Sequence, residues 1–217
     1  MHFNIRTYED RDRESIRQIC CDTALQGKPI DRFFHDREIV AELLTAYYTD
    51  FEPASCWVAE YSGQVIGYLT GCRNNRRYAS KLTWPLVPRM LGKALSRGLF
   101  LKKLTWRLLM TTIKNWQIGS LSKSFPWDQN SGHLHIDVSD QFRGQRVGQR
   151  LMEKFVQQAT EAGLRGIYAV TYENNLPACR FFEKMGFDVV NRLHRIMPEG
   201  DGDRIHQVLV YRKSLKD

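Results

Sequence analysis

The chain has 217 residues, of which 42% are hydrophobic and 26% are charged, and its formal net charge is +8. This composition is typical of a globular protein and is sufficient for one domain, residues 1–217, with a full core. The five cysteines form no CxxC pair, which argues against a zinc site or a disulfide framework. The sequence contains no run of 18 uncharged apolar residues, the length needed to cross a membrane. Its first residues also lack the apolar run of a signal peptide. We therefore expect a cytoplasmic protein with reduced thiols.

The first 70 residues predict three strands and two helices. Hydrophobic residues alternate with polar ones over residues 3–7, as in a strand, and they recur at helical spacing over residues 11–24 and 36–48. Two further apolar runs, at residues 56–61 and 65–70, flank Ser62-Gly63, a pair typical of a tight turn. These two runs are expected to form a hairpin.

A long basic segment follows the hairpin. Between Tyr61 and Trp127 the chain has 12 lysines and arginines and no acidic residue, whereas the remainder has 20 basic and 24 acidic residues and a net charge of −4. The positive charge is therefore local. Tryptophan, leucine and methionine are interspersed among the basic residues, largely at helical spacing, which predicts a basic helical insertion at about residues 73–131.

Three interpretations of residues 73–123 remain open. Helices that mix lysine, arginine and tryptophan with aliphatic residues often lie on an anionic membrane. The same charge would attract an acidic protein or a nucleic acid, although no motif for base-specific recognition is present. Alternatively, the apolar residues pack on the domain and the charges are solvated. A positive field at this place would favour acidic or amphipathic substrates over polycationic ones.

The next turn in the chain predicts a phosphate site. It joins a strand that ends at Val138 to a helix whose apolar positions recur every four residues from Val147 to Ala159. The first amides of a helix have no partner within it and carry partial positive charge, so they hold an anion without any special side chain. Two glycines let the backbone approach the anion and two arginines add positive charge, namely Gly144, Gly148, Arg143 and Arg146.

The region after this helix supports the prediction. The helix ends near Ala162-Gly163 and is followed by an apolar strand at residues 167–170. A second helix begins after Asn175, which can cap it, has Pro177 in its first turn and ends at Gly186. The rest of the chain predicts an antiparallel pair of strands and a polar hairpin tip, at residues 187–191, 205–211 and 198–203 respectively.

These two segments resemble the GCN5-related N-acetyltransferase (GNAT) superfamily, whose members transfer an acyl group from coenzyme A to an amine. The family signature is Gln or Arg, two residues, Gly, one residue, then Gly or Ala. Here Arg143, Val147 and Gly148 fit, and Arg146 stands where the first glycine usually is. The stretch from Asn175 to Phe187 resembles the family's later helix. The resemblance implies a mixed α/β sheet and acetyl-CoA, or another acyl-CoA, as cosubstrate.

The run from His133 to Val138 is more narrowly similar to acetyltransferase-like domains related to the one attached to O-GlcNAc hydrolases. By the wider resemblance, the backbone of this strand would pair with the pantetheine arm of coenzyme A, and the turn would hold the pyrophosphate. The residues so implied are Ile136, Asp137 and Val138 in the strand, Arg143, Gly144, Gln145, Arg146, Val147 and Gly148 in the turn, and Asn175 and Phe182 in the later helix. No metal is implied.

The group that protonates the departing thiolate stays open. Many family members have a tyrosine where this chain has Phe182, and phenylalanine cannot donate a proton. Because a thiol is a good leaving group, loss of the acid would cost on the order of a hundredfold or more in rate rather than abolish the reaction. Tyr172 and Tyr168 are the nearest donors in sequence, and water is a further one. The last alternative is that the protein binds acyl-CoA without turning it over.

The general base is equally open. On a regular strand His133, His135 and Asp137 point to the face opposite Val138. A bulge would exchange the faces and bring Asp137 near the amine as the base, directly or through water, with His135 as its rival. The other interpretation is that these polar residues hydrogen-bond a neighbouring helix.

The sequence therefore supports two functions. The first is an acyl-CoA-dependent N-acyltransferase that acts on a small-molecule or protein amine. The second is a catalytically weak or inactive coenzyme A-binding module, which could dock through residues 73–123 on an acidic protein or an anionic membrane. A peripheral membrane-docking role is compatible with either function.

Overall fold

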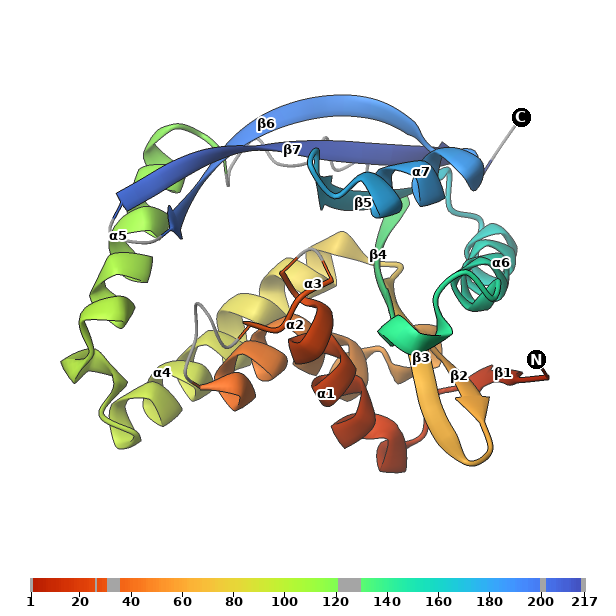
Figure 1. Ribbon diagram of the computed structural model, residues 1–217, viewed down its shortest axis with the longest axis horizontal. Helices are drawn as coiled ribbons and strands as arrows, with labels where there is room; N and C mark the ends of the chain where they lie inside the picture. Colours follow the sequence, from red (N-terminus) through yellow and green to blue (C-terminus); the bar gives the residue numbers. More distant parts are fainter. Residues whose placement is uncertain (1, 26, 31–35, 121–129, 200–201, 216–217) are drawn as a thin grey trace.

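The computed structural model describes residues 2–25, 27–30, 36–120, 130–199 and 202–215 (Figure 1). The strands in these ranges are β1 Asn4–Thr7, β2 Cys56–Tyr61, β3 Gln64–Cys72, β4 Ser131–Val138, β5 Gly166–Tyr172, β6 Asp188–Glu199 and β7 Gly202–Ser214. The α-helices are α1 Arg13–Thr23, α2 Arg37–Phe51, α3 Asn75–Lys81, α4 Val87–Ser96, α5 Lys103–Gln117, α6 Val147–Glu161 and α7 Leu176–Lys184. Short helical turns are η1 Asp10–Asp12, η3 Pro53–Ser55, η4 Leu82–Leu86, η5 Leu99–Leu101 and η6 Asp140–Phe142.

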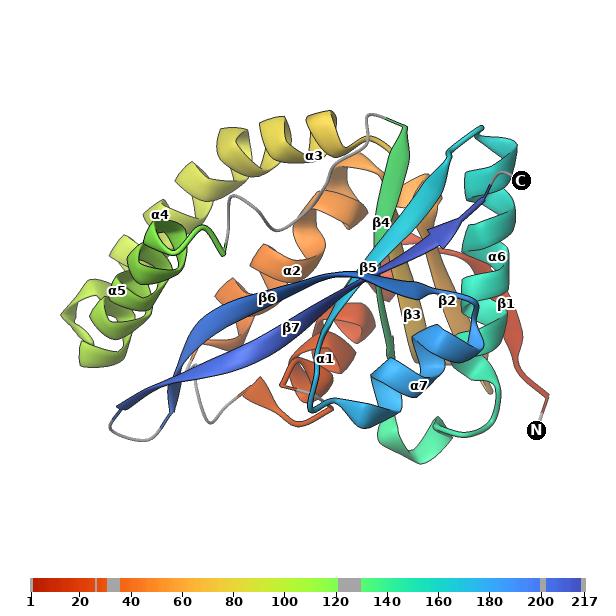
Figure 2. The ribbon, with the colours of Figure 1, turned by 90° about the horizontal axis from the view of Figure 1, so that it is seen from above.

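The strands form one mixed sheet in the order β1-β2-β3-β4-β5-β7-β6. Neighbouring strands are antiparallel except β4 and β5, which are parallel. The predicted mixed α/β sheet is thus confirmed. The last two strands are longer than the sequence predicted, and their far ends lie beyond the body of the sheet (Figures 1 and 2).

Helices cover both faces of the sheet (Figure 1). On one face, α6 buries Leu151 and Phe155 in a cluster that includes Leu134 of β4. A side chain at Gly71 of β3 is excluded there, because its Cβ would lie 2.0 Å from the Phe155 ring. On the other face, α1 and α2 form a second cluster, in which Tyr68 of β3 is fully buried. Successive residues of β4 therefore face two different layers.

Strands β4 and β5 pair only at their beginning. Their register runs from Ser131 opposite Gly166 to His133 opposite Tyr168, although β4 continues to Val138. On its other side β4 stays paired with β3 up to Val138, without a shift of register. Residues 134–138 therefore have a neighbouring strand on one side only, among the strands described.

The predicted basic segment is mostly helical where the structure describes it. Helices α3, α4 and α5 connect β3 to β4, and α4 and α5 lead away from α2 toward the far ends of β6 and β7 (Figures 1 and 2). Asn115 of α5 joins these parts, because its side-chain amide donates to the Ile196 carbonyl and accepts from the Ile196 amide, both at 2.8 Å. That the segment is an insertion into the family fold stays a prediction.

Acidic residues from outside the basic segment neutralise half of its 12 positive charges. The ion pairs join Arg73 to Glu52, Arg89 to Glu42 and Asp50, Lys93 to Glu38 and Glu42, Arg97 to Asp36 and Glu38, and both Arg107 and Lys114 to Asp203. The positive field expected from sequence is therefore weaker than the charge count suggests. Lys123 and part of the predicted tip at residues 198–203 lie outside the described residues.

Candidate functional site

The turn before α6 has the backbone of an anion site. Gly144 and Arg146 both have left-handed conformations, with φ of 76° and 66°. Arg146 thus adopts a conformation natural for glycine at the position where the GNAT signature has one, and its side chain is exposed to solvent. The sequence departs from the signature here, but the backbone does not.

The first amides of α6 receive no side-chain cap. Its N-cap residue, Arg146, accepts no hydrogen bond from them through its side chain. By contrast, Asp36 caps α2 by accepting from the Ile39 amide at 3.1 Å, and Asn175 caps α7 by accepting from the Ala178 amide at 3.4 Å. Uncapped amides at a helix start are a ready-made anion site. The capping role predicted for Asn175 is confirmed.

Arg143 does not face the turn as a free cation. Its Nε donates to the Val138 carbonyl at 3.2 Å, and its guanidinium pairs with Asp140 at 2.7 Å. The nearby Gln145 amide donates to the Gln141 carbonyl at 3.2 Å. These contacts brace the turn against the end of β4, so that backbone amides rather than side-chain charge define the site.

Gly148 lies where α6, α7 and β4 meet. A Cβ at this position would be 3.4 Å from the Phe181 ring and 3.7 Å from Ile136 Cδ1, which is ordinary contact. Only a larger side chain would collide. Ile136 and Val138 pack against the hydrophobic cluster between α6 and the sheet, and Val147 is buried within that cluster. Only the backbone of Val147 is therefore available to a ligand.

Asp137 lies on the opposite face of β4. Because β3 and β4 pair regularly, it is directly across from Tyr68, whose hydroxyl donates to Asp137 Oδ2 at 2.7 Å. Burial raises the pKa of Asp137 to about 6, against the opposing effects of Tyr68 and of Thr23 of α1. A carboxylate with this pKa is suited to accept a proton near neutral pH. The bulge considered from sequence is not present in this register.

His133 and His135 share this face but differ in environment. His133 is buried between the Tyr48 hydroxyl, 2.9 Å from Nε2, and Asn75 Oδ1, 2.7 Å from Nδ1, and burial lowers its pKa to about 3. It is a structural residue that bonds α2 and α3, as the alternative interpretation had it. The His135 side chain is solvent-exposed, although surrounding protein lowers its pKa, and it forms no hydrogen bond with the described residues.

Tyr172 lies across the divergence of β4 and β5. Counting four residues on from the last pair, His133 and Tyr168, Tyr172 corresponds to Asp137 and shares its side of the strands, although β4 and β5 no longer pair there. Its ring contacts His206 at a centroid distance of 5.8 Å, and no hydrogen bond from its hydroxyl occurs within the described chain. Tyr168 is buried, with the Arg212 guanidinium 5.9 Å from its ring.

Phe182, unlike Tyr172, is part of a core. Only 5% of it is exposed, and its ring lies 5.5 Å from that of Phe187 and 5.4 Å from that of Tyr211. The structure therefore surrounds this position with apolar rings. Its predicted contact with the coenzyme stays a prediction.

Three neighbours of Asp137 and His133 were missed by the sequence interpretation, namely Tyr68, Tyr48 and Thr23. Tyr68 and Tyr48 hold Asp137 and His133, while Thr23 lies beside Asp137. Each is more than 60 residues from its partner along the chain. Tyr68 could have been identified only from the antiparallel register of β3 with β4, which places it opposite Asp137. That register cannot be deduced from the sequence, because the long basic segment separates the two strands.

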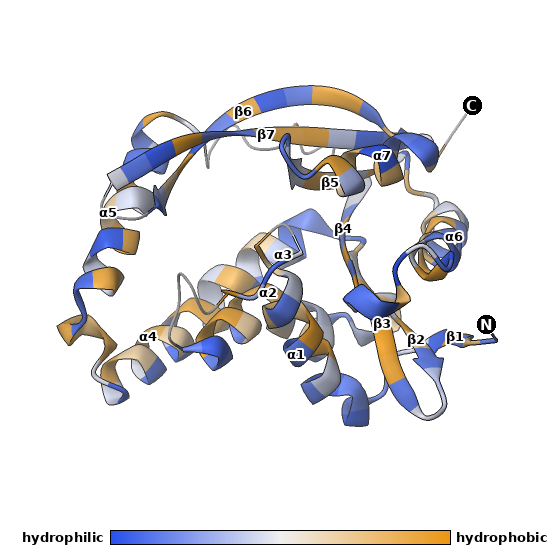
Figure 3. Cartoon of the chain, viewed as in Figure 1, coloured by the Kyte–Doolittle hydropathy of each residue, from blue (hydrophilic) through white to orange (hydrophobic). Residues whose placement is uncertain are grey.

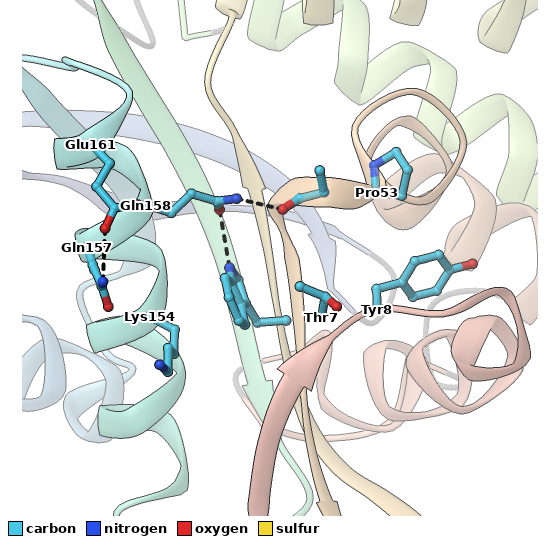
Figure 4. Close-up of a pocket in the computed structure, with 9 residues that line it drawn as sticks. Thr7, Tyr8, Pro53, Lys154, Gln157, Gln158 and Glu161 are labelled. Carbon is cyan, nitrogen blue, oxygen red and sulfur yellow. Dashed lines mark hydrogen bonds between the residues drawn. The ribbon is translucent and has the colours of Figure 1, made fainter.

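A separate pocket of about 650 Å³ lies at the other end of α6 (Figure 4). Thr7, Trp57 and Lys154 contribute to its lining, and Gln158 bridges its wall by accepting from Trp57 Nε1 and donating to the Ala54 carbonyl. Lys154, the lining residue nearest the start of α6, comes seven residues after Val147, a rise of about 10 Å. The pocket is therefore not part of the phosphate turn. No cluster of metal-ligating residues occurs in the described ranges.

Sequence comparisons show what the region around this site is similar to. Residues 109–187 match the model of the acetyltransferase (GNAT) family. A streptothricin acetyltransferase from Escherichia coli is 34% identical over 70 residues, which are 32% of this chain. The chain spans 40% of the length of that relative.

Solved structures show the same fold over the whole chain. SsHAT has a TM-score of 0.72 at 21% identity, and an N-acetyltransferase from Staphylococcus aureus Mu50 has 0.63 at 15%; each comparison covers all of both chains. The yncA protein of Salmonella typhimurium, solved with its cofactor acetyl-CoA, has 0.59 at 15% and covers all of this chain and 96% of that one. The fold is thus that of N-acetyltransferases. The family match contains β4, the phosphate turn, α6 and α7, so this part of the chain is similar to the acetyltransferase (GNAT) family.

Proposed function

We propose that this protein is an acetyl-CoA-dependent N-acetyltransferase. The observation that carries the proposal is the uncapped start of α6, which follows directly on a strand, β4, whose edge lacks a partner beyond His133. The amides can hold a pyrophosphate, and the free edge can pair with an amide-containing arm as a further strand would. Coenzyme A has both groups, and the related fold of yncA was solved with acetyl-CoA.

The residues at this site fit the coenzyme. The amides of Gly144, Val147 and Gly148 would hold its pyrophosphate, and the backbone of Ile136 to Val138 would hold its pantetheine arm. The wall between these points is apolar, formed by Ile136 and Phe181 around Gly148. When bound, acetyl-CoA supplies an acetyl group activated as a thioester.

Side chains on the opposite face of β4 would then manage the protons. An Asp137 carboxylate oxygen takes a proton from the acceptor's ammonium group, and the Tyr68 hydroxyl keeps that carboxylate oriented. His135, about 7 Å along the strand, is exposed and forms no hydrogen bond with the residues that the structure describes, and it is the alternative acceptor of this proton. The Tyr172 hydroxyl donates a proton to the departing sulfur. Asp137, His135 and Tyr172, which carry these roles, all lie where β4 and β5 diverge.

The acceptor that fits best is an amphipathic or acidic amine. Unpaired cations remain along the basic segment at Arg76, Arg77, Lys102 and Lys103 within the described residues, and apolar side chains lie exposed among them. The E. coli relative is named for streptothricin, so this compound belongs in an acceptor panel. The narrower likeness to O-GlcNAc hydrolase-related domains rests on residues 133–138 alone and stays a prediction. A reducing, cytoplasmic location is supported by five buried cysteines, none of which forms a disulfide within the described residues.

Phe182 favours a second candidate function, a coenzyme A-binding module without turnover. This position lacks a hydroxyl and is enclosed by apolar rings. The discriminating variant is Phe182→Tyr. A rise in turnover of tenfold or more would identify a lost acid and support this second function for the natural chain. Unchanged turnover in Phe182→Tyr, together with a large loss in Tyr172→Phe, would support Tyr172 as the donor.

Thiol release from acetyl-CoA, followed with a panel of amines, tests the enzyme directly. We expect Asp137→Asn to lower kcat by about 10² to 10⁴-fold, the range of general base catalysis. For the natural protein, log kcat/KM should fall as the pH drops through about 6, because Asp137 then becomes protonated. If His135→Gln removes this inflection and Asp137→Asn does not, His135 is the base. Tight coenzyme binding without turnover of any amine would contradict the enzymatic proposal.

Coenzyme binding is tested separately by Arg146→Asp. A carboxylate at the N-cap would accept hydrogen bonds from the uncapped α6 amides and would repel a pyrophosphate. The Kd for coenzyme A, measured by calorimetry, should therefore rise at least tenfold. Lys154→Asp makes the same charge change further along α6, at an exposed position, and should leave Kd nearly unchanged. An equal loss in both variants would mean that net charge, rather than the turn, controls binding.

A further inference from the structure

Helix α5 is amphipathic in the reverse sense to a normal surface helix. Its buried residues are the polar Thr111 and Asn115, which face β6. Leu104 and Leu108 are half-buried, but the other five of its large apolar side chains are exposed to solvent, with Trp116 67% exposed. Helices that pack on a protein core turn their apolar stripe toward it. We call the exposed set the α5 face, and it consists of Leu101, Trp106, Leu109, Met110, Ile113 and Trp116.

Helix α4 shows the same reversal. It has no buried residue, and its basic residues Arg89, Lys93 and Arg97 pair with acids of α2 and its N-cap. Val87, Leu91 and Leu95 recur on the other side and are all exposed. Apolar residues, drawn in orange in Figure 3, accordingly occur along both helices although neither helix buries them. Most of the exposed large apolar side chains among the described residues belong to this basic segment.

The turn between α4 and α5 extends the α5 face. The Trp106 indole donates to the Phe100 carbonyl at 2.7 Å, which fixes this turn against the helix. Leu101 is 91% exposed there, and the next two residues are Lys102 and Lys103, both exposed and without an ion pair among the described residues. An apolar tip followed by free lysines is the pattern of a helix that lies in a membrane interface.

We propose that the α5 face docks on a lipid bilayer that carries anionic headgroups. Tryptophan and leucine enter the boundary between headgroups and acyl chains, and Lys102 and Lys103 contact the anionic surface. A second copy of this chain is a poorer occupant, because two-fold packing of these faces would bring their lysines together and offer no acid within the segment to pair with them. No helix in the described ranges is long and apolar enough to span a bilayer, so the contact is peripheral.

The ion pairs of the basic segment define the character of this contact. Because half of its cations are already paired with protein carboxylates, apolar insertion contributes most of the binding and two lysines contribute the rest. Binding should therefore decline only modestly as salt is raised. A surface that used all 12 cations would show a much steeper decline.

Flotation of the full chain with vesicles of phosphatidylcholine, with and without phosphatidylglycerol, tests the proposal. The natural protein should float with the anionic vesicles. Leu101→Glu should lower the partition coefficient more than tenfold, whereas Ile205→Glu, at a 69% exposed position on β7, should leave it unchanged. The double variant Lys102→Glu, Lys103→Glu should lose about 25-fold or more on anionic vesicles, since each cation contributes about fivefold.

Two results would overturn docking. One is a folded protein that fails to float with anionic vesicles at low salt. The other is sedimentation that shows a stable dimer which Leu101→Glu dissociates, because the second copy would then occupy the face. Acetyl transfer to a soluble amine, measured on the same variants without vesicles, should be unchanged in Leu101→Glu. Loss of docking and failure of the proposed enzymatic activity are thereby separately visible.

Discussion

Helices α5 and α6 have the same length, 15 residues, and both are amphipathic, but they present opposite sides to the protein. Helix α6 buries Val147, Leu151, Met152, Phe155 and Ala159 against the sheet. Helix α5 buries a threonine and an asparagine and exposes its apolar side. The period of a hydrophobic pattern thus predicts a helix in both cases, but it does not say what covers the apolar side.

The difference follows from what each helix packs against. Below α6 lies a sheet face made apolar by Leu134 and Ile167, with Gly71 making room for the Phe155 ring. Beside α5 lies the end of the β6–β7 hairpin, where backbone groups at Ile196 and the Asp203 carboxylate need polar partners. Polar groups removed from water must be paired, so α5 turns Asn115 and Lys114 toward the hairpin.

Truncation of an apolar side chain on each helix gives the largest expected contrast. Leu151→Ala opens a cavity in the α6 core and should lower the free energy of unfolding by about 2 to 5 kcal/mol. Trp116→Ala removes a larger side chain from α5, but it should change the free energy of unfolding by no more than about 0.5 kcal/mol, because the Trp116 side chain is largely solvated. Urea denaturation measures both. A loss above about 2 kcal/mol in Trp116→Ala would show that the α5 face is covered in solution.

The polar side of α5 should be the stabilising one. Asn115→Ala removes both hydrogen bonds to Ile196 and leaves two backbone groups without their partner, at an expected cost of about 1 to 3 kcal/mol. Amide hydrogen exchange at Ile196 should accelerate, while exchange in α6 stays as in the natural protein. Thr112→Ala, on the exposed side of the same helix, is the matched control. Equal effects of the two variants would mean that Asn115 is not the link between helix and hairpin.

Much of the fold could be predicted from local pattern. The α6 positions Val147, Leu151, Phe155 and Ala159, the Asn175 cap and the alternating strands all follow from residues within a few positions of one another. The order of the strands and the length of β6 and β7 could not, because pairing partners are distant along the chain. The ion pairs between α4 and α2 could not be predicted either, because their partners are also distant along the chain and a count of basic residues says nothing about pairing.

The candidate site divides along the same line. Its backbone half, from Gly144 to Gly148, was predictable because turn and helix start are local features. Its proton-transfer half was not, because the environment of Asp137 depends on Tyr68 and Thr23, which two other elements supply. A regular strand leaves Asp137 on the face that the alternation in β4 indicated, without the bulge that was considered for bringing it to the amine.

The smallest expected effect is at the start of α6, where the chain departs from the family signature. Arg146→Gly relieves the strain of a non-glycine residue in a left-handed conformation, which is about 1 to 2 kcal/mol. It also raises the conformational entropy of the unfolded chain, which lowers the free energy of unfolding by about 0.4 to 1 kcal/mol. The net result should be a gain of about 0 to 1.6 kcal/mol in the free energy of unfolding. Gly144→Ala is the reciprocal control, because its Cβ meets nothing within 4 Å and φ is 76°, so strain alone should make it lose about 1 kcal/mol. If Arg146→Gly instead destabilises the protein while Gly144→Ala behaves as expected, the exposed Arg146 side chain has a stabilising contact that outweighs its backbone strain, and α6 would then not begin as freely as its bare amides indicate.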